Sequence, residues 1–115
     1  MIRVYHGPVP FIFEASCREK EELCAQVSER LSQYHCVAEV STNDLNAAFR
    51  LTNTIDSDWW LNPGVQFFGS AEYGKEGARS TSMCDVLECH NGELVVVSAV
   101  GFTPLPRPAQ FRGNQ

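Results

Sequence analysis

The Asn91-Gly92 pair constrains the fold of this chain more than any other feature, because it separates two apolar runs, residues 85–89 and 94–101. Asn-Gly between β-rich segments is the strongest short-range signal of a β-hairpin, since both residues accept a positive φ angle. We therefore predict a hairpin closed by a two-residue type I′ turn. Residues 94–97 contain no polar side chain, which favours a central strand that is covered on both faces.

The turn also fixes the register of the predicted hairpin, because strands joined by a two-residue loop pair outward from that loop. The predicted facing pairs are Cys89 with Leu94, Glu88 with Val95, Leu87 with Val96, and Val86 with Val97. Pairs of this kind share a face, so one face of the hairpin is expected to hold Leu87, Cys89, Leu94 and Val96. The opposite face is expected to hold Val86, Glu88, Val95 and Val97.

The rest of the chain indicates further strands and two helices. Short β-rich segments bounded by turn residues predict strands at 2–6, 35–40 and 65–68. A capping box at 16–19 and apolar residues at helical spacing predict an amphipathic helix over 17–33. A shorter helix is expected over 43–53, after Ser41 and Asp44 at capping spacing.

These elements predict an α+β fold, in which one long and one shorter helix pack on a small, mostly antiparallel sheet of four to five strands. At 115 residues the chain is long enough for one domain with a real core. We expect that domain to span residues 1–102. Residues 103–115 contain three prolines and no apolar stripe, which predicts a flexible tail.

The charge and hydropathy of the chain exclude some classes of function. A net charge of −5 argues against direct nucleic-acid binding, because a phosphate-backbone binder needs clustered lysines and arginines. The same acidity favours a basic protein partner. The sequence has no apolar run near the roughly 20 residues that span a bilayer, and its N-terminus does not have the pattern of a signal peptide. We therefore expect a cytoplasmic protein with no membrane association.

Five cysteines without a Cys-x-x-Cys pair indicate reduced, mostly buried thiols rather than a disulfide framework or a zinc knuckle. The dipeptides His35-Cys36 and Cys89-His90 together offer four zinc-binding side chains. However, neighbouring residues of a strand point to opposite faces, so at most one residue of each dipeptide reaches a common site. We expect neither a metal ion nor another cofactor.

The segment 79–85 is a polar cluster with two interpretations. Asp85 follows Ser82 by three residues, the spacing at which a serine cap and a carboxylate exchange hydrogen bonds with the backbone, which predicts a helical turn over 82–86. The alternative is a polar pocket, in which Arg79 and the hydroxyls of Ser80 and Ser82 bind an anion or a partner's carboxylate beside Asp85.

Residues 54–64 form an unusual loop that combines two acids, Asp56 and Asp58, with the adjacent rings of Trp59 and Trp60. Tryptophan is costly to leave in water, so at least one ring is expected to pack on the core. The other ring either packs as well or is a candidate recognition residue, with the two aspartates beside it.

Four blocks of the sequence resemble a family of short proteins carried by phages, plasmids and integrative elements, with an RSTS-x-x-DV signature similar to that of YodL-like domains. The blocks are Leu45-x-x-Ala48-Phe49-Arg50-Leu51-Thr52-Asn53-x-Ile55-Asp56, Trp59-Trp60-x-Asn62-x-Gly64-Val65, Arg79-Ser80-Thr81-Ser82-x-x-Asp85-Val86 and Val96-Val97-x-x-Val100-Gly101-Phe102. Such proteins usually have a glycine where this chain has Cys84, and the helix at 17–33 resembles an addition. The resemblance, which spans about 36–102, implies a mobile-element context and brings no established activity.

These observations leave three hypotheses about function. The first is a binding protein that inhibits a host defence complex, of the anti-restriction or anti-CRISPR type, by covering a basic nucleic-acid channel. The second is a module that binds a small ligand or nucleotide through Arg79 and its hydroxyls, with a tryptophan as a stacking plate. The residues expected on the negative face in the first hypothesis are Glu19, Glu21, Glu22, Asp56 and Asp58.

The third hypothesis is an enzyme, which needs a nucleophile or an acid-base pair held together in a pocket. No spacing in the sequence links the available residues into a recognised constellation, so we favour binding over catalysis. Those residues are Cys84, Asp85, His35, His90 and Arg79.

Overall fold

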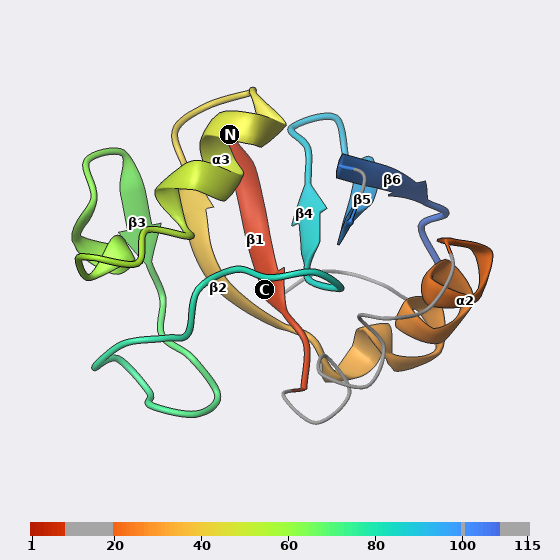
Figure 1. Cartoon of the computed structure of the whole chain (residues 1–115), viewed down its shortest axis with the longest axis horizontal. Helices are drawn as coiled ribbons and strands as arrows, with labels where there is room; N and C mark the ends of the chain where they lie inside the picture. The colour runs from red at the N-terminus through yellow and green to blue at the C-terminus, as the bar shows by residue number, and fades with distance from the viewer. Residues whose placement is uncertain (9–19, 100, 109–115) are drawn as a thin grey trace.

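The computed structural model of the chain describes residues 1–8, 20–99 and 101–108, and of Lys20 and Glu21 it describes the backbone alone (Figure 1). The described part contains six strands, two α-helices and two short 3-10 helices. In chain order these are β1 (Ile2–His6), α2 (Lys20–Arg30), η1 (Leu31–Gln33), β2 (His35–Val40), α3 (Leu45–Leu51), η2 (Trp59–Leu61), β3 (Val65–Phe67), β4 (Val86–Glu88), β5 (Leu94–Ser98) and β6 (Gly101–Leu105).

All six strands form one sheet in the order β3-β2-β1-β4-β5-β6, with every neighbouring pair antiparallel. The fold is therefore α+β, as predicted, with one strand more than expected. The additional strand arises because the apolar run that begins at Leu94 does not continue to residue 101. It ends at Ser98, and β6 starts at Gly101, where φ is +124° and glycine adopts the left-handed region without strain.

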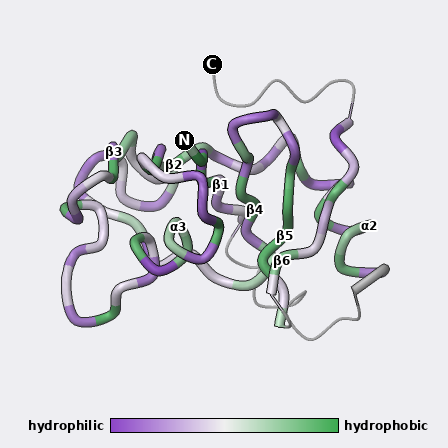
Figure 2. The backbone as a smooth tube through the Cα atoms, turned by 90° about the horizontal axis from the view of Figure 1, so that it is seen from above, coloured by the Kyte–Doolittle hydropathy of each residue, from purple (hydrophilic) through white to green (hydrophobic). Residues whose placement is uncertain are grey.

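The sheet separates two apolar clusters, one on each face. On one face α2 packs against β5 and β6, and on the other α3 lies across β1 and β2 with Trp59 beside it (Figure 1). Figure 2 shows a continuous hydrophobic stretch along β5, whose residues 94–97 are buried on both faces. This strand lies inside the sheet, so its prediction as a central strand is confirmed.

The register predicted for the hairpin is wrong by one residue. The observed pairs are Val86 with Val96, Leu87 with Val95, and Glu88 with Leu94. The slip exchanges the two faces, so Val86, Leu94 and Val96 join the cluster under α2, while Leu87, Val95 and Val97 join the cluster under α3.

The physical reason for the slip is a three-residue loop in place of the two-residue type I′ turn. Gly92 N–H donates to the Cys89 carbonyl, and Cys89 N–H donates to the Glu93 carbonyl. The loop between Cys89 and Glu93 therefore has three residues, 90–92. Gly92 has a φ of +91°, whereas Asn91 has no positive φ and instead accepts a hydrogen bond from Glu93 N–H through Oδ1. This is a turn followed by a glycine bulge, the other common use of Asn-Gly in hairpins.

The boundaries of the helices and the tail also differ from prediction. The helix expected over 17–33 is α2 followed by the 3-10 turn of η1, and residues 17–19 lie outside the described range. The helix expected over 43–53 is shorter, because the Asp44 carboxylate caps its start by accepting from Asn46 N–H and Thr52 ends it. Residues 103–105 belong to β6 rather than to a tail, since Pro104 occupies an edge strand where its missing N–H is harmless.

Candidate functional site

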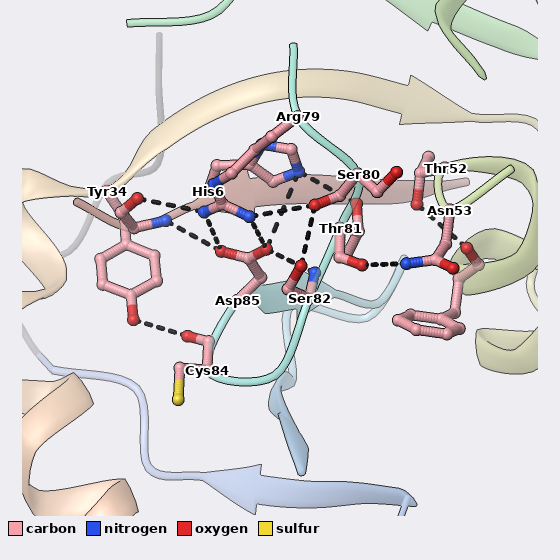
Figure 3. Close-up of polar contacts among 12 residues, drawn as sticks. His6, Tyr34, Thr52, Asn53, Arg79, Ser80, Thr81, Ser82, Cys84 and Asp85 are labelled. Atoms are coloured by element: carbon pink, nitrogen blue, oxygen red, sulfur yellow. Dashed lines mark hydrogen bonds and ion pairs between the residues drawn. The ribbon is translucent and has the colours of Figure 1, made fainter. Parts of the chain in front are cut away.

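The segment 79–85 is built around the carboxylate of Asp85, which is fully buried at the start of β4 (Figure 3). Both Nη atoms of Arg79 donate to it, each over 2.7 Å. The backbone N–H groups of Gly7 and Ser82 donate to the same carboxylate over 3.0 and 2.8 Å. Four donors, two of them cationic, therefore satisfy a charge that would otherwise be very costly to bury.

Arg79 has little hydrogen-bonding capacity left for a ligand. Besides Asp85, its Nη atoms donate to the carbonyls of Ser80 and Gly7, both over 3.1 Å. Its buried Nε has no hydrogen-bond partner among the described residues and lies 3.8 Å from a Glu72 oxygen. Burial alone would lower the pKa of Arg79, but the bonds to Asp85 and its charge outweigh that effect and raise the pKa. The arginine is committed to holding β1 and β4 together.

The predicted helical turn over 82–86 is a β-turn instead. Asp85 N–H donates to the Ser82 carbonyl over 3.1 Å, and the third turn residue, Cys84, has a φ of +79°. A positive φ at that position is the mark of a type II turn, which cannot continue as a helix. One of the two expected capping hydrogen bonds is present, because Ser82 N–H donates to the Asp85 carboxylate. The Ser82 hydroxyl instead donates to the Ser80 carbonyl over 3.0 Å.

His6, which sequence reasoning did not single out, is part of the same network. Its Nε2 lies 3.0 Å from the hydroxyl of Thr81 and 3.9 Å from Asp85 Oδ2, while Nδ1 has no hydrogen-bond partner in the described part of the chain. Burial lowers the pKa of His6 to about 4, although the charge of Asp85 opposes the shift. The available signal was its position, a polar residue that closes the strand just before Gly7.

Trp59 is the ring that packs in the core, as predicted for one of the pair. It is 1% exposed, and its Nε1 donates to the Arg79 carbonyl over 2.9 Å. Trp60 is partly buried against Phe67 and against the backbone of Gly77, where an added Cβ would lie 2.9 Å from the ring. Both rings thus stabilise loops, and Trp60 holds the loop of residues 54–64 against residues 69–77.

These two loops form one end of the molecule, beside β3, with a distinctive surface (Figure 1). We call residues 54–64 and 68–77 the β3 end. Four of the five large hydrophobic side chains that are exposed in the described residues lie there, and they are Ile55 (90%), Leu61 (74%), Tyr73 (64%) and Phe68 (38%). Asp56 and Asp58 are exposed among them. Glu22, expected on the same negative face, instead lies on α2 at the opposite end of the sheet, because α2 packs on β5 and β6.

Among the candidate enzyme residues, the structure joins Arg79 to Asp85, next to Cys84 in the chain, but places His90 elsewhere. The Cys84 thiol is fully buried, and that burial, with the nearby charge of Asp85, raises its pKa to about 11, which is unfavourable for a nucleophile. His35 pairs with His6 at one end of β1, whereas His90 lies in the hairpin loop at the other end. Among the described residues no group of three or more His, Cys, Asp or Glu side chains is placed to hold a metal ion.

The chain was compared with protein-family models, with curated proteins and with solved structures, and none of the three comparisons gives a match. Within the described residues, each helix is too short or too polar to cross a bilayer.

Proposed function

We propose that this protein acts by binding a basic protein partner through the β3 end. The observation that carries the proposal is the combination found there, exposed apolar side chains among an excess of negative charge. Residues 54–77 hold four carboxylates and one lysine, a net charge of −3 in a chain whose total is −5. Large apolar side chains exposed together are uncommon on monomeric proteins and mark interaction surfaces.

The two kinds of side chain have different roles in such an interface. Ile55 and Leu61 are anchors, because apolar side chains that become desolvated at the centre of an interface supply most of its binding energy. Asp56 and Asp58 steer a positively charged surface toward them and disfavour acidic competitors. The rigid support beneath is the packing of Trp59 and Trp60, which fixes the loop before binding.

The proposed partner is a host defence complex that handles nucleic acid in the cytoplasm. A basic channel that normally receives a phosphate backbone offers the charge that the β3 end complements. The resemblance to proteins of phages, plasmids and integrative elements supports this choice. The protein would then inhibit the complex by occupying the channel, without touching nucleic acid itself.

The test begins with affinity capture from host lysate, followed by titration calorimetry with the purified partner. We expect a partner with a basic surface, and a loss of affinity of about tenfold or more for Ile55→Ser, since hot-spot substitutions cost about 2 kcal/mol. The double variant Asp56→Asn/Asp58→Asn should bind more weakly through a slower, less salt-dependent association. The charge-matched control is Glu22→Gln/Glu29→Gln on α2, which should bind as the wild type does. Equal affinity of all these variants, or an acidic partner, would overturn the proposal.

The ligand-binding and enzymatic hypotheses have less support from the same geometry. Arg79, the residue on which the ligand hypothesis depends, spends both Nη atoms on Asp85 and on backbone carbonyls. Trp59 is buried, so a nucleotide base cannot stack on its ring. Trp60 is partly buried against Gly77, so only part of its ring is accessible to a base.

A further inference from the structure

A groove of about 380 Å³ opens between the end of β1, the start of β2 and the loop after β3. Its walls are of two kinds. Pro8 and Ala71 contribute apolar surface above the buried Val37, while His6, Gln33, His35 and Glu72 contribute polar atoms. Ala71 and Glu72 belong to the β3 end, so the groove is continuous with the surface proposed to bind the partner.

The charges around the groove do not cancel. Arg79 carries one positive charge, but it forms two short hydrogen bonds with buried Asp85, and the pair is neutral as a unit. Glu72 lies 3.8 Å from Arg79 Nε without a hydrogen bond to it and keeps 28% of its side chain exposed. Burial keeps His6 uncharged at neutral pH, so it adds no repulsion toward a cation. One negative charge remains at the rim of the groove.

His6 also bears on which ligand the groove can take. The side chain is 3% exposed, and its Nε2 faces the hydroxyl of Thr81 and an oxygen of the Asp85 anion. Nδ1 of the same ring has no hydrogen-bond partner among the described residues. The groove wall therefore presents the Glu72 carboxylate as an acceptor to a ligand rich in donors.

We infer that this groove receives a lysine side chain of the basic partner, with its aliphatic stem along Pro8 and Ala71 and its ammonium group at Glu72. A lysine combines a four-carbon apolar stem with a compact cation, which matches the two kinds of wall. This inference rests on the proposed function, because it assigns one contact of the same interface. It is tested without the partner, so that the two proposals can fail separately.

The probe is N-acetyl-lysine N-methylamide, titrated into the isotope-labelled full chain while amide and imidazole NMR signals are recorded. The titration is run at pH 8, above the ordinary pKa of imidazole near 6.5. We expect saturable shifts at His6, His35 and Glu72, and none with N-acetyl-norleucine N-methylamide, which keeps the stem but lacks the ammonium. Glu72→Gln should abolish the shifts, whereas Glu76→Gln, an exposed carboxylate of the same loop outside the groove, should leave them unchanged.

A second variant separates the stem from the charge. Ala71→Leu keeps Glu72 and fills the apolar wall, so it should weaken lysine binding at least threefold while the melting temperature stays the same. Equal shifts with the norleucine probe, or shifts that persist in Glu72→Gln, would overturn the inference. If the lysine probe fails while the variants of Ile55 and of Asp56 and Asp58 still lose the partner, this inference falls and the proposed function stands.

Discussion

Replacing Arg79 by alanine should destabilise the protein strongly, because it leaves the Asp85 carboxylate buried without its cation. Asp85 is 0% exposed, and the substitution removes two hydrogen bonds of 2.7 Å. Breaking a buried ion pair by removing one partner costs about 3–5 kcal/mol, since the remaining charge is no longer compensated.

The structure places the expected cost near the lower end of that range. Gly7 N–H and Ser82 N–H still donate to Asp85 in the variant, and Arg79 is 18% exposed, so some water can follow the truncated side chain. We therefore expect a loss of about 3 kcal/mol in the free energy of unfolding. Arg79→Lys should recover only part of it, because an ammonium group cannot donate to both carboxylate oxygens in the planar, forked manner of guanidinium.

The assay is urea denaturation followed by circular dichroism at 25 °C, with the denaturant slope compared between variants to test two-state unfolding. Arg50→Ala is the matched control, since Arg50 is exposed on α3, and it should change stability by about 0.5 kcal/mol or less. An Arg79→Ala protein that loses less than about 1 kcal/mol would refute the assignment of a structural role. It would return Arg79 to the list of binding residues.

Three further predictions concern stability. Gly7→Ala should cost about 1–3 kcal/mol in urea unfolding, because its Cβ would lie 2.6 Å from Tyr34 Cζ in a packed site; wild-type stability would contradict this. Gly92→Val should lower the melting temperature because φ is +91°, and Asn91→Pro should do so because proline is disfavoured as the third turn residue; unchanged melting would place the turn elsewhere. His6 has a pKa of about 4 in the folded protein and about 6.5 in the unfolded chain, so between these pH values only the unfolded chain gains a proton. The free energy of unfolding should therefore be at its full value above pH 6.5 and fall by about 3 kcal/mol toward pH 4. A His6→Gln variant with the same pH profile as the wild type would refute this prediction.

Local patterns predicted most elements of the fold but not how they meet. The strand at 35–40 was predicted with its observed bounds, because a β-rich run followed by four polar residues leaves little ambiguity. Asn91-Gly92 predicted the hairpin but not its register, since the pair suits both a two-residue turn and a turn with a glycine bulge. The two alternatives differ by one residue, and the choice depends on which face α2 covers.

The polar network could not be predicted, because its partners are far apart in the chain. Gly7 and Asp85 meet only through the pairing of β1 with β4, a contact across 78 residues that no local spacing encodes. The spacing of Ser82 and Asp85 was recognised, but it fits a helix cap and a β-turn equally well. The deciding feature is the positive φ of Cys84. The sequence does not indicate a positive φ here, because residues other than glycine rarely adopt one.

Cys84 also bears on the resemblance to mobile-element proteins. Their usual glycine at this position would adopt a φ near +79° freely, whereas a cysteine there is strained by about 1–2 kcal/mol. The surroundings hold it in place, since the Tyr34 hydroxyl donates to the Cys84 carbonyl and Cys84 N–H donates to the Val97 carbonyl. The same geometry accounts for the spacing of Arg79, Ser82 and Asp85, because Arg79 and the Ser82 N–H both donate to Asp85 in the turn that precedes β4. In this chain the segment 79–85 is therefore a structural element, which leaves the exposed side chains of the β3 end as the candidate binding surface.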